Sequence, residues 1–484
     1  MDAKQIATLG RQLNRFLAEF SDCFGRSEPR QHLRTYVRGQ LSDLPRKSAE
    51  PIALAAGTPP RTLQRFLEAV QWDQHRLRDR LQWIVARDHA HPQALGVIDE
   101  QGDPKKGGKT AAVQRQWCGH SGKLDNCVVA VHSSYVAGDF HCLIDSDLFL
   151  PQDWAQDPQR RQEAHIPDEV GYRKKTRIAL DQVQRALGNG IRVAAWTFDE
   201  LYGRDREFLD GLESLGQNYV GEIPCDFSGW LREPTLLLRP TPQQMRKQGR
   251  KRPFPRLAAQ TPPACEVRNL VQYSPRFRKQ SWQRFHIKDG EKGPQVWEVK
   301  AARFYRKHDQ GLPGKPHILI VARNVLDPDE IKYFLSNLPP GTLLEWMLWV
   351  AFSRWPIERC FQQAKDELGL DHFEVRSWGA IHRHLYITQL SHLFCARVHQ
   401  QLREKKHSNA VPDRRAGASG RFGVAEGPRA VAFGPLAALS EDRGANRLLP
   451  ASQPASATFP RQDDPPPFTE AGHPGRPVEI VCAG

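Results

Sequence analysis

The chain has 484 residues, which is enough for two or three domains with hydrophobic cores of their own. Its composition, 39% hydrophobic and 26% charged residues, is typical of a soluble globular protein. The most apolar run, residues 343–352, is too short to span a bilayer and contains Glu345, and the N-terminal residues lack the apolar segment of a secretory signal. We therefore expect a cytoplasmic protein with no membrane partner.

The net charge of +14 is concentrated in one segment. Residues 230–280 contain twelve Lys/Arg and two acids, which gives +10 (12 − 2) in about a tenth of the chain. A local field of this strength favours a polyanionic partner, most simply nucleic acid, and a solubilising basic loop is the alternative. Arg250, Lys251 and Arg252 form the densest part of this segment.

Two weaker motifs carry little weight. The nine cysteines include no C-x-x-C pair, which favours reduced thiols over a disulfide framework. Cys118, His120 and Cys127 make a poor metal site because no fourth ligand is evident. GDPKKGGKT, residues 102–110, resembles a phosphate-binding loop, but Gly108 stands where that motif requires lysine.

Helices are predicted first along the chain, and strands follow. Residues 1–90 place apolar residues at three- and four-residue spacing, as in RTLQRFLEAVQWDQHRLRDRLQWIV. Arginines on the polar faces suit a small DNA-binding domain, and a plain packing domain is the alternative. From about residue 91 the pattern changes to short β-rich runs: QALGVIDE, NCVVAVHSSYVAG and DFHCLIDSDLFLP, the last two forming a hairpin at Ala137-Gly138.

Helix and strand then alternate up to about residue 225. The expected elements are a helix in GYRKKTRIALDQVQRALGNG, a strand in IRVAAWTFDE, a helix in DREFLDGLESLG and a strand in QNYVGEIP. Neighbouring strands followed by this alternation indicate a mixed α/β sheet over residues 91–225.

Residues 226–315 interrupt the alternation and are rich in Pro, Lys and Arg. Short β-like runs such as PQVWEVKAARFYR lead us to interpret them as an inserted, basic, partly β module. HILIVARN returns to the strand pattern, and DPDEIKYFLSNLP is expected to begin a helical region that continues to about residue 400. We therefore assign residues 316–405 to the second part of the α/β unit.

The tail differs from the rest of the chain. Eleven of the 37 prolines fall in the last 78 residues, among many Gly, Ala and Ser and without a sustained period. This composition predicts disorder over residues 406–484. A frameshifted reading frame is a second explanation for the abrupt change, and the other two frames of the gene would test it.

Three carboxylates occupy positions where catalytic groups collect. Asp99 and Asp199 close two of the predicted strands, and Glu358 lies on a later helix. Converging acids repel each other unless a cation joins them, and hard ions such as Mg²⁺ take oxygen ligands. Two such ions, about 3.5–4 Å apart, can activate a nucleophile and stabilise the leaving oxygen of a phosphodiester. For each acid taken alone, a solvated strand end or helix face is the ordinary alternative.

The segment SRWPIERCFQQAK, residues 353–365, predicts a helix that begins near Pro356. Glu358 and Lys365 share one face of it, and Arg354 comes just before it. An acid for a metal ion and a base for a DNA phosphate suit nucleic-acid chemistry, and an exposed Glu/Lys face is the alternative. The adjacent face is an apolar stripe of Ile357, Phe361, Ala364 and Leu368.

With these residues in place, the sequence resembles the DDE transposases of bacterial insertion sequences that carry a Tyr-x2-Arg-x3-Glu-x6-Lys signature. Arg354, Glu358 and Lys365 match the Arg, Glu and Lys of this signature, and Ala351 stands at its Tyr position. The likeness extends to GVIDEQGDPKKGGKTAAVQRQWCGHSGKLDNC around the first acid, TFDELYG around the second and ELGLDHFEVRSW after the third.

The resemblance implies an α/β fold with a ribonuclease-H-like mixed sheet and flanking helices. The core would be interrupted by a β-rich insertion between the second Asp and the Glu, and the likeness covers about residues 60–400. The implied function is cleavage of transposon-end DNA and joining of the 3′-OH to target DNA, with Mg²⁺ as cofactor and Mn²⁺ as a substitute. The implied partners are double-stranded DNA and a second copy of the chain, in the bacterial nucleoid.

The resemblance also assigns roles to individual residues. Asp99, Asp199 and Glu358 are the implied catalytic metal ligands. The implied or candidate DNA contacts are Arg354, Lys365, Lys105, Lys106, Arg250, Lys251 and Arg252. Trp230, Trp282 and Trp297 are candidates for stacking on a flipped base, with core packing as the alternative. Two other hypotheses are a catalytically inactive, transposase-derived DNA-binding protein and a nuclease without strand transfer.

Overall fold

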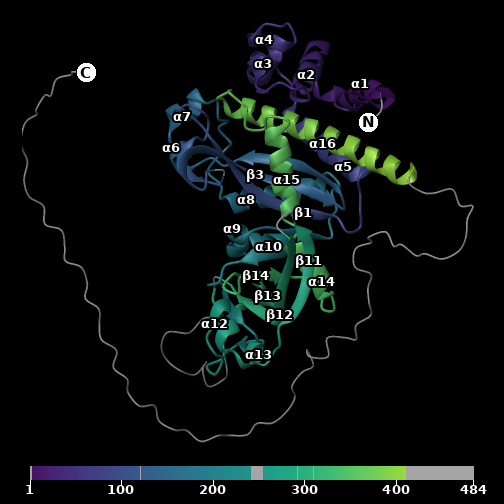
Figure 1. Ribbon diagram of the computed structural model, residues 1–484. Helices are drawn as coiled ribbons and strands as arrows, with labels where there is room; N and C mark the ends of the chain where they lie inside the picture. The colour runs from purple at the N-terminus through teal and green to yellow at the C-terminus, as the bar shows by residue number, and fades with distance from the viewer. Residues whose placement is uncertain (1–2, 120, 241–253, 291–292, 309, 410–484) are drawn as a thin grey trace, which may run out of the picture. The chain divides into compact units, whose positions relative to one another are not determined.

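The computed structural model describes residues 3–119, 121–240, 254–290, 293–308 and 310–409 (Figure 1). Sheets and helices both contribute to the core, which confirms the mixed α/β class expected from the sequence. Arg250, Lys251, Arg252, His120 and the tail from residue 410 lie outside these ranges. Among the described residues, no helix is long and apolar enough to cross a membrane.

Helices are present between residues 3 and 90, where the sequence predicted them, and they pack against the last helix, α16 (Trp378–Asn409). Gln40 donates to the Thr388 hydroxyl over 2.7 Å, and the Tyr36 hydroxyl lies 2.9 Å from Nδ1 of His384. These buried contacts join the two ends of the described chain in one core. The helical elements are α1 (Ala3–Ala18), η1 (Ser21–Cys23), α2 (Ser27–Gln40), α3 (Ala49–Ala55), α4 (Pro60–Glu68) and α5 (Gln74–Asp88).

The first sheet contains β1 (Leu95–Pro104), β2 (Gln114–Cys118), β3 (Lys123–Ala137), β4 (Phe140–Leu148) and β5 (Ala195–Thr197). Its order is β2-β3-β1-β5, and β4 also pairs with β3. Strand β1 is antiparallel to β3 and parallel to β5. The expected hairpin of β3 and β4 is confirmed, with Gly138 at a φ of +60° in the turn. Glycine suits this turn because its first central residue needs a positive φ.

Helices connect β4 to β5 and continue after it. They are α6 (Gln152–Gln156), α7 (Pro158–Glu163), α8 (Lys175–Gly188), α9 (Glu200–Arg204) and α10 (Arg206–Ser214). The expected helices at α8 and α10 are therefore present. Helix α8 packs on the sheet, where Gln182 donates to the carbonyl of Val131 over 2.8 Å.

The second sheet has the order β10-β7-β12-β13-β14-β6, with β11 paired to β12. Its strands are β6 (Val220–Ile223), β7 (Ser228–Trp230), β10 (Cys265–Glu266), β11 (Gln283–Gly290), β12 (Gly293–Lys307), β13 (Pro313–Asn324) and β14 (Ile331–Ser336). A pair of short strands, β8 (Leu236–Leu237) and β9 (Arg256–Leu257), and two helices, α12 (Val267–Tyr273) and α13 (Pro275–Arg278), complete this part.

Of two expectations for residues 316–340, one is confirmed and one is wrong. HILIVARN is the expected strand, within β13, and it pairs with β12 and β14 of the second sheet. IKYFLS was expected to be helical and is strand β14. The four residues Tyr333–Ser336 are buried in succession, and a short, continuously buried run has no alternation that would separate a strand from a helix.

One isolated bridge connects the two sheets. Trp196 of β5 pairs in parallel with Tyr219, and the next residues, in β6, pair with β14. The chain therefore leaves the edge of the first sheet and enters the second within a few residues.

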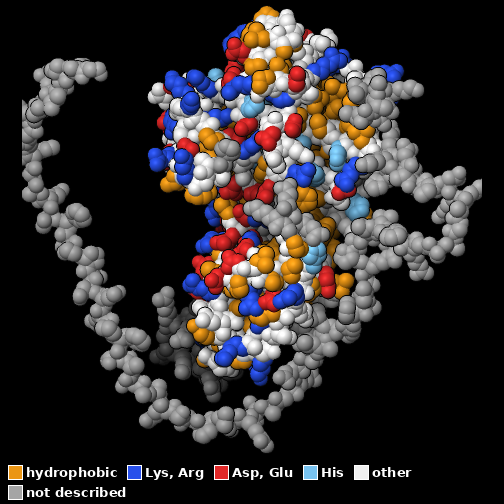
Figure 2. All heavy atoms as spheres, in the orientation of Figure 1, with side chains coloured by type: hydrophobic (Ala, Val, Ile, Leu, Met, Phe, Trp, Pro, Cys, Tyr) orange, Lys and Arg blue, Asp and Glu red, His pale blue; other side chains and the backbone are white. Residues whose placement is uncertain are grey.

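Helices α14 (Leu344–Ala351) and α15 (Trp355–Asp366) follow the second sheet. Helix α15 begins one residue before the expected Pro356 and contacts β1, β3 and β4 of the first sheet (Figure 1). Of the predicted apolar stripe, Ile357 and Ala364 are buried on this helix, Phe361 is half-buried, and Leu368 is buried just after the helix ends. On the face shown in Figure 2, basic side chains are interspersed with acidic ones and do not form a continuous basic surface.

Candidate active site

Asp99 and Asp199 lie at equivalent places beside the parallel strands β1 and β5. The last parallel pair is Val97 with Thr197, and each aspartate comes two residues later in its own chain segment. Asp99 is inside β1, which continues to Pro104, so the expected strand end at Asp99 is wrong. Asp199 follows β5 and is the N-cap of α9. The parallel register thus brings the two acids side by side.

Each aspartate has one oxygen fixed by the backbone and the other facing a single guanidinium. Oδ1 of Asp99 accepts from the amide of Glu100 over 2.9 Å, and Oδ1 of Asp199 accepts from the amide of Leu201 over 3.0 Å. The Oδ2 atoms lie 3.1 Å (Asp99) and 3.9 Å (Asp199) from Nη2 of Arg354.

Arg354 also contacts a third acid that the sequence did not suggest. Its Nη1 lies 3.7 Å from Oε2 of Glu222 in β6, and Glu222 is paired in addition with Lys332. Helix α9 packs tightly on this strand, because a Cβ at Gly203 would lie 1.8 Å from the Glu222 carbonyl oxygen. The run QNYVGEIP contains this acid near the end of its strand, as the runs around Asp99 and Asp199 do, and this was the available signal.

The electrostatics of the pair favour a bound cation. Burial raises the pKa of Asp99 to about 6; Arg354 opposes this rise, and Asp199 adds to it. The pKa of Asp199 is also raised, mainly by burial, against the charge of Arg354. For Arg354, burial alone would lower the pKa, but Asp99 and Asp199 outweigh it and raise it. Two carboxylates that share one counter-charge are stabilised by any additional positive charge.

The structure does not bring Glu358 to the two aspartates. Glu358 is exposed on the first turn of α15, and the described ranges contain no group of three His, Cys, Asp or Glu residues placed to hold a metal ion. The expected cluster of three acids is therefore not seen among the described residues. The group that faces both aspartates is the guanidinium of Arg354. Cys118 and Cys127 are buried thiols.

Two of the expected DNA contacts point inward instead. Nζ of Lys365 lies 3.9 Å from Oδ1 of the buried Asp103, and its side chain is 15% exposed. Nζ of Lys105 donates to the carbonyl of Asp371 over 3.0 Å and lies 3.4 Å from the centre of the Phe373 ring. The charges of both lysines lower the pKa of the buried Asp103, but burial outweighs them and raises it. Lys106 remains exposed.

The three tryptophans differ in burial. Trp230 and Trp297 are core residues, as the packing alternative predicted. Trp282 is half-buried between two cations, with Nζ of Lys300 and the guanidinium of Arg323 at 4.6 and 4.3 Å from its ring centre.

Asp99 and Asp199 suit a hard divalent ion, which takes oxygen ligands. Their Oδ2 oxygens share the single positive charge of Arg354, and burial disfavours two carboxylate charges that are not fully compensated. A third protein donor beside these two is not placed by the described residues. The pair thus fits part of a metal site.

Comparisons with known proteins identify the family. The family model for DDE superfamily endonucleases matches residues 19–294, more than half of the chain. The chain belongs to the DDE superfamily endonucleases. The family expected from the DDE-like motifs is confirmed.

This DDE endonuclease also matches individual proteins. It is 33% identical over 190 residues to a probable transposase for insertion sequence element IS701 from Microchaete diplosiphon. That match spans 38% of this chain and less than half of the relative, 46% of its length. Among solved structures, the NurA nuclease from Sulfolobus solfataricus aligns with 66% of this chain and 86% of its own at 11% identity, with a TM-score of 0.24. A score this low carries no argument about the fold.

Proposed function

We propose that this DDE endonuclease is a transposase that cleaves transposon-end DNA and joins the freed 3′-OH to target DNA. The observation that carries the proposal is the pair of aspartates, Asp99 and Asp199, held side by side and facing one positive charge. The family and the transposase relative support the substrate class. Joining two ends to one target would require at least two copies of the chain.

A ribonuclease-H-like core is part of the proposal. The antiparallel strands β4, β3 and β1, followed by the parallel β5 and the bridge to Tyr219, are the arrangement that such a core needs. The second sheet then stands between the second aspartate and α15, as an insertion would.

In the proposed reaction, Asp99 and Asp199 would hold Mg²⁺, or Mn²⁺ in its place. The metal would supply Lewis-acid activation of water and of the 3′-OH, and stabilisation of the leaving oxygen. The backbone amides of Glu100 and Leu201 hold the carboxylates in position. Arg354 would then be available to contact a DNA phosphate, because its guanidinium is 22% exposed.

Two residues, Glu358 and Glu222, are candidates for the third acid of the site. Glu358 matches the family signature and is exposed, so it could reach the site only through a movement of α15. Glu222 already faces Arg354. We favour Glu358 as the third catalytic acid, and the paired variants described in the Discussion discriminate between the two.

The N-terminal helices are the proposed DNA-binding part. Helices α3 and α4 are joined by a short turn in which Gly57 has a φ of +65°, as in helix-turn-helix motifs. Arg61 and Arg65 are exposed on α4, and both line a hollow of about 710 Å³ between α2 and α4. Such a helix suits the major groove of DNA.

A cleavage assay on the DNA that flanks the gene tests the proposal. Asp99→Asn and Asp199→Asn should abolish cleavage and leave DNA binding intact, while Asp139→Asn, in an exposed turn, should cleave normally. Arg61→Ala and Arg65→Ala should each reduce the salt dependence of binding by about one phosphate contact, with Arg403→Ala as control.

Normal cleavage by the aspartate variants would contradict the proposed chemistry. Binding without any cleavage by the wild type would instead favour the inactive DNA-binding protein. Cleaved but unjoined ends would favour a nuclease without strand transfer.

A further inference from the structure

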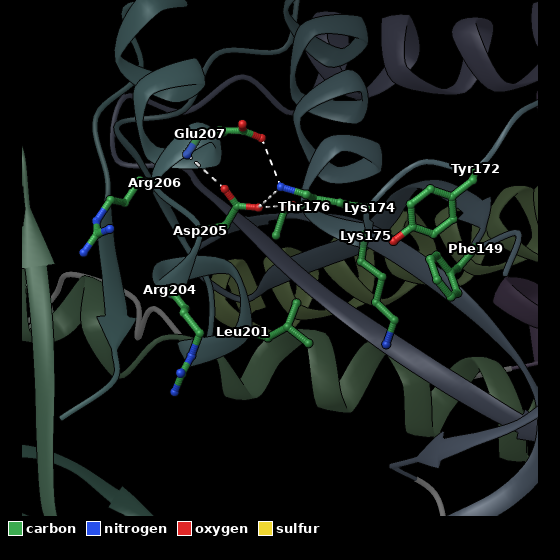
Figure 3. Close-up of a pocket in the computed structure, with 10 residues that line it drawn as sticks. All are labelled: Phe149, Tyr172, Lys174, Lys175, Thr176, Leu201, Arg204, Asp205, Arg206 and Glu207. Atoms are coloured by element: carbon green, nitrogen blue, oxygen red, sulfur yellow. Dashed lines mark hydrogen bonds and ion pairs between the residues drawn. The ribbon is translucent and has the colours of Figure 1, made fainter. Parts of the chain in front are cut away.

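We infer that a second site, beside the aspartate pair, binds one nucleotide of the DNA strand through its base and its phosphate. The inference rests on the proposed function, because it takes DNA as the substrate. The site is a hollow of about 530 Å³ (Figure 3). This volume lies within the roughly 300–1,000 Å³ of ordinary ligand pockets. Its lining residues are Phe149, Tyr172, Lys174, Lys175, Thr176, Leu201, Arg204, Asp205, Arg206 and Glu207.

One side of the hollow offers apolar and aromatic surface that the core does not use. Tyr172 is 47% exposed and Leu201 is 39% exposed, although both are large hydrophobic side chains. The rings of Tyr172 and Phe149 meet edge to face, with centres 6.1 Å apart. Figure 3 shows these two rings together on one side of the hollow. An exposed ring held by a neighbouring ring is a platform on which a nucleic-acid base can stack.

Basic side chains surround this apolar surface. Lys174, Lys175, Arg204 and Arg206 outnumber the two acids of the lining, Asp205 and Glu207. Nζ of Lys174 is 3.1 Å from Oε2 of Glu207 and 3.9 Å from Oδ2 of Asp205, and its side chain is 58% exposed. An exposed ion pair of this kind contributes little to stability, so Lys174 can exchange its partner for a phosphate at small cost.

The hollow is connected to the aspartate pair by direct contacts. The amide of Leu201, which lines the hollow, donates to Asp199. Lys175 pairs with Glu100 over 2.9 Å, and Glu100 follows Asp99 in β1. Consecutive strand residues point to opposite faces. The hollow therefore lies on the face of β1 opposite to Asp99 and reaches the aspartate pair around the end of β5, through Leu201.

Binding of a short fluorescent oligodeoxythymidine, measured without divalent ions so that no cleavage occurs, tests this site. Tyr172→Ala and Leu201→Ala should weaken binding about tenfold, because a stacked base contributes about 1–3 kcal/mol. Tyr172→Phe keeps the ring and should bind like the wild type. Leu326→Ala is the matched control for Leu201→Ala, since Leu326 is 86% exposed and outside the hollow.

Two charge variants give effects of opposite sign. Lys174→Ala should weaken oligonucleotide binding a few-fold, and Glu207→Gln should strengthen it, because it removes a competing acid from Lys174. Wild-type-like binding by Tyr172→Ala and Leu201→Ala, or a wild type that does not bind the oligonucleotide, would overturn the inference.

The binding assay does not depend on the proposed catalytic chemistry. If Asp99→Asn still cleaves DNA while the hollow variants lose oligonucleotide binding, the proposed chemistry fails and the nucleotide site stands. If Asp99→Asn loses cleavage while the hollow variants bind normally, only the nucleotide site fails.

Discussion

Arg354 and Arg306 each face more than one carboxylate, and their surroundings differ. Arg354 lies against Asp99, Asp199 and Glu222 and is 22% exposed. Arg306, in β12, pairs with Asp210 and Glu213 of α10 and is 1% exposed. The first group joins a strand, a helix cap and the second sheet at the proposed active site, and the second joins the second sheet to a helix.

The pKa values of the acids in these two clusters shift in opposite directions. Burial alone would raise the pKa of Glu213, but its hydrogen bond from His317 and the charge of Arg306 lower it to about 2. For Asp99, burial and the second acid, Asp199, outweigh Arg354 and the hydrogen bond from the Glu100 amide, and its pKa rises to about 6. The Arg306 cluster therefore stabilises the fold, whereas the Arg354 cluster retains repulsion that a further cation would relieve.

The largest effect is expected at the aspartate pair. Asp99→Asn and Asp199→Asn should reduce DNA cleavage by about a thousandfold or more, because each removes a proposed metal ligand. The free energy of unfolding should stay the same or rise, since the change removes a repelling charge. Cleavage rates test the first expectation, and urea titrations of the same preparations test the second. A large loss of stability would contradict the contrast between the Arg354 and Arg306 clusters.

At the Arg306 cluster, we expect a large effect on stability. Arg306→Ala should lower the free energy of unfolding by about 3–5 kcal/mol, because it leaves acids without a buried partner. Arg303→Ala, at an exposed position of the same strand, is the control and should change stability little. Urea denaturation measures the stability of both variants. Equal free energies of unfolding for Arg306→Ala and Arg303→Ala would show that Arg306 does not stabilise the fold.

The third acid is the next test. Glu358→Gln should lower cleavage by about a hundredfold at unchanged stability if it joins the metal site, by the scale of other electrostatic catalytic groups. Glu222→Gln should lower cleavage only a few-fold, because it contacts Arg354 and not the substrate. The reverse result, with the larger loss at Glu222, would assign the third position to β6.

The smallest effect concerns pH. Because the pKa of Glu213 is lowered on folding, its contribution to stability is present above the ordinary glutamate pKa of 4.5 and is lost as the pH falls toward about 2. The stability difference between the wild type and Glu213→Gln should therefore shrink on acidification, by up to about 1.4 kcal/mol per pH unit. Urea titrations from neutral pH to about one unit below the glutamate pKa measure it; a constant difference would contradict the assignment.

The sequence predicted much of the fold and two acids of the site, and the reasons are local. Helices α8 and α10 and the β3–β4 hairpin have clear periodicity and glycine signals at their ends. Asp99 and Asp199 follow apolar runs, which a linear pattern can show. The spatial pairing that brings Arg354 and Glu222 to them depends on register between distant strands, and one sequence does not contain that information.

The errors have the same origin. Tyr333–Ser336 of β14 are buried in succession, so the alternation that marks a strand is missing there and a helix was expected. The inward direction of Lys105 and Lys365 was also not foreseen: Lys365 lies 3.9 Å from Asp103 and Lys105 donates to the Asp371 carbonyl, and their role as DNA contacts stays a prediction. Neither partner can be recognised without the fold.

The packing at Gly203 affects the position of one aspartate of the proposed active site. A Cβ at this position would lie 1.8 Å from the Glu222 carbonyl oxygen, so the close approach of α9 to β6 requires glycine, and Asp199 is the N-cap of α9. Any side chain at position 203 would act as a wedge between the two elements and would move the second aspartate away from the first. Alanine at this position should thus mimic loss of the aspartate in cleavage while every charged group of the site is still present.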